Sequence, residues 1–154
     1  ATKPASYDNE ASAELYLLRL RADEHDYPAL FWISRSFAEG MRSVFDVGGS
    51  VGIKYFAYSR LLPFPDDVRW TVQDMPAVAA RGRQFAEEQK ASARLFFTSE
   101  FRDGDGSDVL FASGALQYLP ASLGQLLGQL ARPPRRIMTR RSSSGSWARR
   151  SPSR

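Results

Sequence analysis

Short apolar runs alternate along the chain with longer segments of helical periodicity. Runs rich in β-branched and aromatic residues and bounded by turn residues predict buried strands, and apolar residues spaced three or four apart predict amphipathic helices. Strands are expected near 43–47, 69–73, 94–98, 108–113 and 135–138, and helices near 10–22, 28–39, 52–62, 76–91 and 120–131. This rhythm predicts an α/β fold with a mostly parallel sheet covered by helices on both faces.

An acid lies near the end of the first predicted strand, and a glycine-rich turn follows the strand. Asp46 lies within the apolar run, and Gly48, Gly49 and Gly52 follow it. Glycine permits positive φ angles and close approach of a ligand to the backbone, so the turn is typical of a site for a nucleotide-like cofactor. A phosphate-binding P-loop is excluded, because Gly-Lys-Ser/Thr does not end the turn. The dinucleotide spacing G-x-G-x-x-G also fails, which leaves a nicotinamide-dependent oxidoreductase as an alternative that shares only the strand, turn and helix.

A second acid, Asp74, follows the next predicted strand, and Pro76 then opens a helix. This arrangement resembles the class I S-adenosylmethionine-dependent methyltransferases, whose first motif runs acid-x-Gly-x-Gly-x-Gly. Asp46, Gly48 and Gly52 match that motif. The resemblance implies a Rossmann-like, doubly wound fold in three α/β/α layers. The sheet of that family has seven strands in the order 3-2-1-4-5-7-6, so the last two strands are expected to be missing from this chain.

The resemblance further implies S-adenosyl-L-methionine as the cofactor. Asp46 would hold its methionine part, Met75 would pack on its adenine, and Asp74 would bind its ribose, since a carboxylate accepts two hydrogen bonds from neighbouring hydroxyls. Ser50 stands where the family has its middle glycine. The implied cofactor residues are Asp46, Gly48, Gly49, Ser50, Gly52, Asp74, Met75, Ser99, Glu100, Phe101 and Ser113, and the residues implied to border the acceptor are Gln117 and Tyr118.

Three segments, 48–55, 70–76 and 111–118, narrow the resemblance. Together they resemble a bacterial group of inferred methyltransferases that is often found with surface-polysaccharide genes. The implied activity is methyl transfer to a small-molecule acceptor such as a sugar hydroxyl or an amine, and no catalytic residue is assigned. The likeness covers about residues 10–138. A catalytically inactive cofactor-binding fragment is the other alternative.

Composition limits the other function classes. The 154 residues are 43% hydrophobic and 12% aromatic, as in a globular domain. The chain has no cysteine and one histidine, so neither a disulfide scaffold nor a metal site is expected. Charged residues interrupt its apolar stretches, so no membrane span or signal peptide is expected, and a cytoplasmic location follows. Nothing indicates the oligomeric state.

The positive charge of the chain is concentrated at its end. Residues 1–131 contain 13 Lys and Arg against 17 Asp and Glu, whereas residues 132–154 contain eight Arg and no acid. The folded body is therefore not expected to bind nucleic acid. An Arg/Ser-rich tail over 139–154 is expected to be disordered, either as an RNA-binding arm or as the product of a shifted reading frame. The remaining chain divides into an N-terminal helical segment, 1–40, and the cofactor-binding domain, 41–138.

The segment before the first predicted strand holds the sole histidine, His25, and two aromatic residues, Phe31 and Trp32. A lone histidine beside an acid in a linker is usually solvated or caps a helix, and we expect the same of His25. Phe31 and Trp32 are expected to pack in the core.

Overall fold

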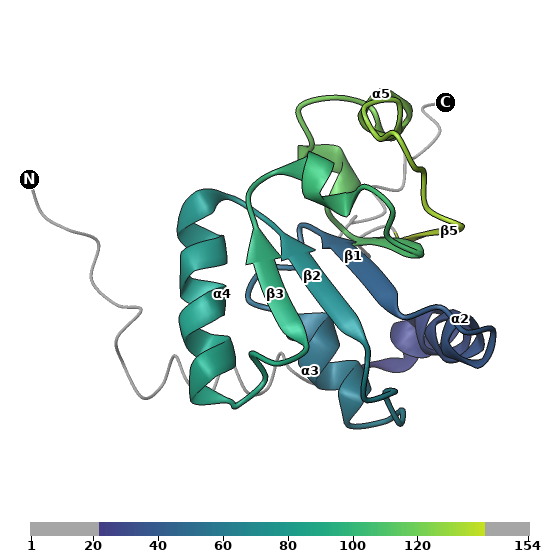
Figure 1. Cartoon of the computed structure of the whole chain (residues 1–154), viewed down its shortest axis with the longest axis vertical. Coiled ribbons are helices and arrows are strands. Elements are labelled where there is room, and N and C mark those ends of the chain that lie inside the picture. The colour runs from purple at the N-terminus through teal and green to yellow at the C-terminus, as the bar shows by residue number, and fades with distance from the viewer. Residues whose placement is uncertain (1–21, 141–154) are drawn as a thin grey trace, which may run out of the picture.

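The computed structural model describes residues 22–140, which form a five-stranded, all-parallel sheet with helices on both faces (Figure 1). The strand order is β3-β2-β1-β4-β5. The strands are β1 Ser43–Val47, β2 Arg69–Gln73, β3 Leu95–Thr98, β4 Val109–Ser113 and β5 Arg136–Arg140. The α-helices are α2 Tyr27–Ala38, α3 Ile53–Ser59, α4 Pro76–Glu88 and α5 Leu123–Leu127, and the short 3-10 helices are η1 Glu24–Asp26, η2 Phe101–Gly104 and η3 Leu116–Tyr118.

The five predicted strands are confirmed, and three predicted helices prove too long. The helix expected over 76–91 ends at Glu88. The helix expected over 52–62 ends at Ser59, where the chain turns, and the one expected over 120–131 is limited to Leu123–Leu127 between a Ser122 cap and Gly128. Strand β5 runs through Arg140, so residues 139–140 do not belong to a tail. The helix expected over 10–22 lies almost wholly outside the described residues, as does the chain after 140.

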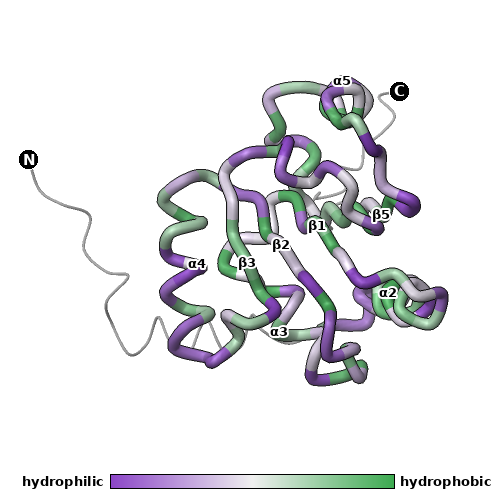
Figure 2. Tube along the Cα trace, in the orientation of Figure 1, coloured by the Kyte–Doolittle hydropathy of each residue, from purple (hydrophilic) through white to green (hydrophobic). Residues whose placement is uncertain are grey.

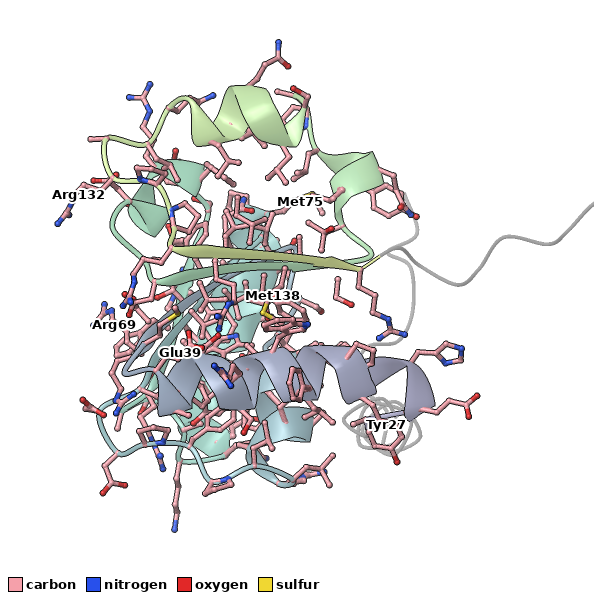
Figure 3. All side chains as sticks on the ribbon, turned by 90° about the vertical axis from the view of Figure 1, so that its right-hand side faces the viewer. Tyr27, Glu39, Arg69, Met75, Arg132 and Met138 are labelled. Atoms are coloured by element: carbon pink, nitrogen blue, oxygen red, sulfur yellow. The ribbon has the colours of Figure 1, made fainter. Side chains whose placement is uncertain are left out.

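Two apolar clusters fill the space on either side of the sheet. The larger cluster joins α2, α3 and α4 to one face and has the fully buried Trp70 among its largest side chains. The smaller cluster lies on the other face, where Phe45 and Leu110 meet η2, η3 and α5. Figure 3 shows the sheet edge-on between α5 and α2, with Met138 pointing from β5 toward α2. Figure 2 shows hydrophobic residues in the central strands and alternating polar and apolar residues along α4.

Phe31 and Trp32 are not core residues, contrary to the sequence-based expectation. Their exposed fractions are 61% and 46%, because they lie on the side of α2 that faces away from the core. The opposite side of the helix carries the buried Ile33 and Phe37. Trp32 instead lies under the guanidinium group of Arg136, 5.1 Å from its ring centre, where a cation–π contact is favourable.

The carboxyl ends of all five strands lie at one edge of the sheet, because the strands are parallel. The strand order reverses between β1 and β4, so the connections that leave these two strands go to opposite faces. Ligands of open α/β sheets bind in the crevice that forms at such a point. In the part of the chain that the structure describes, no helix is long and apolar enough to cross a membrane.

Candidate cofactor-binding site

The turn after β1 passes through a gap that admits backbone only. Gly48 has a φ of +67°, and a Cβ placed on it would lie 2.4 Å from the Cβ of Ala115 in the segment after β4. Its N–H donates to the carbonyl oxygen of Gln73 at the end of β2, at 2.7 Å. The turn therefore lies against the ends of both neighbouring strands, and a side chain at Gly48 would push them apart.

Asp46 lies directly beneath this turn, with an exposed fraction of 1%. Its Oδ2 accepts a hydrogen bond from the indole Nε1 of Trp70 at 3.1 Å. A Cβ on Gly49 would lie 2.4 Å from the same oxygen, so the carboxyl group packs against bare backbone. Burial raises the pKa of Asp46 to about 7, while the hydrogen bond from Trp70 and the charge of Lys54 oppose this rise.

The second oxygen of Asp46 lacks a partner. Oδ1 is buried and accepts no hydrogen bond from any residue within 22–140. A buried polar atom without a partner costs roughly 1–3 kcal/mol, and native proteins leave few of them without a reason. An acceptor oxygen held in this way beneath a glycine turn is suited to a ligand that brings a hydrogen-bond donor, above all a cationic one.

Asp74 joins the turn after β2 to the glycine turn. Its Oδ2 accepts from the backbone N–H of Ser50 at 2.9 Å, and its Oδ1 accepts from the N–H of Met75 at 2.8 Å. A carboxylate has about four acceptor positions, so two remain for the hydroxyl groups of a ligand. Ser50 has a φ of +58°, in the left-handed region that glycine usually occupies, and its N–H is the donor to Asp74.

The other predicted site residues lie in the turns at the same edge of the sheet. Met75 is 68% exposed at the start of α4, and Ser99 and Glu100 are exposed after β3. Phe101 packs edge-on against Phe45, with the ring centres 5.8 Å apart, in the cluster on the second face of the sheet. Its ring is thus a core element rather than a free surface.

The remaining three predicted residues follow β4. Ser113 is the half-buried last residue of that strand, and Gln117 and Tyr118 are exposed in η3, Tyr118 to 81%. Of the whole predicted set, Asp74 and the glycine turn are joined by a direct hydrogen bond, and Asp46 lies against the same turn. The residues after β3 and β4 share the edge with this group but have no hydrogen bond to it among the described residues.

Sequence reasoning missed a buried polar cluster around Asp26, whose side chain is fully buried. Its carboxylate accepts from Lys54 Nζ at 2.8 and 3.0 Å, from the Tyr58 hydroxyl at 2.7 Å and from an Arg140 guanidinium nitrogen at 2.6 Å. Burial acts to raise the pKa of Asp26, but the hydrogen bonds, that of Lys54 above all, hold it below its usual value. The sequence gives little signal for this cluster, because Asp26 resembles a simple helix-start acid.

His25 lies exposed beside this cluster, and its backbone N–H donates to Asp23. It lines one end of a cleft of about 510 Å³ between α2 and β5, which Trp32, Met138 and Arg140 also line. The glycine turn does not line this cleft.

Comparisons with known proteins show the fold. No protein-family model matches the chain, and no curated protein sequence matches it either. Among solved structures, an N,N-8-amino-8-demethyl-D-riboflavin dimethyltransferase from Streptomyces davawensis matches with 22% identity over 78% of this chain and 33% of its own, at a TM-score of 0.50. An O-methyltransferase family protein from Burkholderia thailandensis matches with 19% identity over 80% of this chain and 38% of its own, at a TM-score of 0.51.

The chain has the Rossmann-like fold of these methyltransferases. It spans 33% and 38% of the lengths of these two proteins.

Proposed function

We propose that this chain is a methyltransferase that uses S-adenosyl-L-methionine to methylate a small-molecule acceptor. The observation that carries the proposal is the unpartnered Oδ1 of Asp46, buried beneath a glycine turn where the strand order reverses. The cofactor fits this environment, because the ammonium group of its methionine part is the charged donor that such an oxygen requires. The methyltransferase structures with the same fold support the assignment.

We propose the following roles for the other residues at this edge of the sheet. The remaining acceptor positions of Asp74 bind the ribose hydroxyls, and the backbone from Gly48 to Gly52 approaches the ribose and methionine parts. Met75 packs on the adenine, a task that suits its exposed and flexible thioether side chain. The turn after β3, with Ser99, Glu100 and Phe101, borders the adenine, and Ser113 at the end of β4 lies toward the transferred methyl group.

The bound cofactor supplies a methyl group that its sulfonium has already activated. The protein then has mainly to hold the cofactor and the acceptor in line, and proximity and orientation supply most of the rate enhancement. Gln117 and Tyr118 border the acceptor, which we propose to be a sugar hydroxyl or an amine. No general base is assigned.

Two other functions remain as outcomes of the test. A nicotinamide-dependent oxidoreductase shares the strand, the turn and the ribose-binding acid, but the chain lacks the glycine spacing of that class. A catalytically inactive fragment would bind the cofactor without transferring its methyl group.

Calorimetric titration of the wild-type chain with S-adenosylhomocysteine and, separately, with NAD tests the proposal. We expect saturable binding of S-adenosylhomocysteine and much weaker binding of NAD. Tighter binding of NAD would contradict the proposal. A screen of labelled methyl transfer to sugars and amines then separates an enzyme from an inactive cofactor-binding fragment.

A further inference from the structure

The buried cluster around Asp26 brings two cations to one fully buried carboxylate. Lys54 and Arg140 both donate to a single carboxylate, and Tyr58 adds a neutral donor. A further acid, Asp23, is 60% exposed and forms an ion pair with Arg140 at 3.7 Å. Buried charges are normally paired with opposite charges, because an unpaired buried charge loses its hydration and gains no ion pair in exchange. Arg140 is thus shared by Asp26 and Asp23, whereas Asp26 is the only side-chain ion-pair partner of Lys54 among residues 22–140.

Lys54 is the cation of this cluster that lies beside the candidate site. It stands two residues after Gly52, in the first turn of α3, and its side chain is only 19% exposed. Its charge acts on the carboxyl group of Asp46. Arg140 lies at the end of β5, which is separated from β1 by β4.

The ammonium group of Lys54 is held in place and still has bonding capacity. It donates to both oxygens of Asp26, at 2.8 and 3.0 Å, and an ammonium group has three donors. Among the residues that the structure describes, no other side-chain acceptor bonds to it, so one donor remains for a ligand. A long, flexible side chain fixed in this way loses little further freedom on binding.

We propose that Lys54 binds the carboxylate of the cofactor's amino-acid part, and that Asp26 positions Lys54 for this contact. The inference rests on the proposed function. An amino acid carries its ammonium and carboxylate groups on one carbon atom, so the groups that recognise them must be an acid and a base close to each other. Asp46 is the acid with an unpartnered oxygen, and Lys54 is the base in the first turn of the helix that follows the same glycine turn.

The test combines a change in the ligand with a change in the protein. Calorimetry measures the dissociation constants of S-adenosylhomocysteine and of its decarboxylated analogue, which keeps the ammonium group. We expect the wild type to prefer S-adenosylhomocysteine by about tenfold or more, as for the loss of a charge-assisted hydrogen bond. In Lys54→Met this preference should fall to about twofold or less, because the partner of the carboxylate is gone.

Lys90→Met is the matched control, since it removes the same charge from an exposed position after α4, at the opposite edge of the sheet. It should keep the full preference of the wild type. Binding of the decarboxylated analogue reports whether each variant is folded. Should Lys54→Met bind neither ligand, Lys54→Gln takes its place, because its amide can still donate to Asp26 without carrying a charge.

The possible results separate the two proposals. A Lys54 variant that binds the analogue and keeps the wild-type preference overturns the role of Lys54 and leaves the proposed function intact. A wild type that binds neither ligand overturns the proposed function and this inference with it.

Discussion

Asp46 should make the folded protein less stable as the pH rises, and Asp46→Asn should remove that dependence. Burial raises the pKa of this carboxyl group from 3.8 to about 7, so the folded chain holds the proton more tightly than the unfolded chain. The stabilisation from the neutral carboxyl group is fully present below about pH 4 and is lost as the pH rises through about 7. A salt-bridged acid has the opposite effect, because it makes the folded protein more stable as the pH rises.

The size of the effect follows from the shift. One pKa unit corresponds to about 1.4 kcal/mol, so a rise of about three units amounts to roughly 4 kcal/mol in all. Between pH 5 and pH 8 the share that is lost is about 2–3 kcal/mol. The acids whose pKa is lowered by their partners, among them Asp26 and Asp108, titrate below this window and do not obscure it.

Urea denaturation at several pH values from 5 to 8 measures the free energy of unfolding. We expect a fall of about 2–3 kcal/mol for the wild type and less than half of that for Asp46→Asn, which should also be the more stable protein at pH 8. Asp66→Asn, which removes an exposed carboxyl group, is the control and should follow the wild type. A wild type with a flat profile, or an equal fall in Asp46→Asn, would refute the reasoning.

Three further substitutions test single contacts. Trp70→Phe removes the N–H that favours the charged form of Asp46, so the pH at which S-adenosylhomocysteine binding is half-maximal should move up; an unchanged midpoint would contradict this. Gly49→Ala should weaken binding about tenfold or more because its Cβ would collide with that carboxyl group, whereas Gly124→Ala, which meets nothing within 4 Å, should not. Asp108→Ala removes the acceptor for the backbone N–H groups of Arg42 and Ser43 at the start of β1 and should lower the free energy of unfolding in urea by about 1–3 kcal/mol.

The sheet could be predicted from the sequence because each strand is a short apolar run with turn residues on both sides. The lengths of the helices were harder to predict, since local chemistry ends them. After Ser59, the N–H groups of Leu61 and Leu62 both donate hydrogen bonds to the carbonyl oxygen of Tyr58. These bonds close a turn and end the helix, although the apolar pattern of the sequence continues. At α5, Gly128 ends the helix after five residues.

The candidate site was predictable where its signal is local. The acid and the glycine turn lie within seven residues of one another, and Asp74 follows its strand directly. The contacts that set the properties of the site join residues far apart in the chain. Trp70 is 24 residues from Asp46, and Arg140 is 114 residues from Asp26. No sequence periodicity reports such pairs, so the Asp26 cluster became apparent only in the folded structure.

The proposed function requires that Asp46 and Asp74 hold S-adenosyl-L-methionine at the carboxyl edge of the sheet. It is tested by titration of S-adenosylhomocysteine into the wild type, Asp46→Ala and Asp74→Ala, each shown by circular dichroism to be folded. The wild type should bind, and each variant should lose affinity by about tenfold or more, because each loses a charge-assisted contact. Unchanged affinity in both variants would contradict the account.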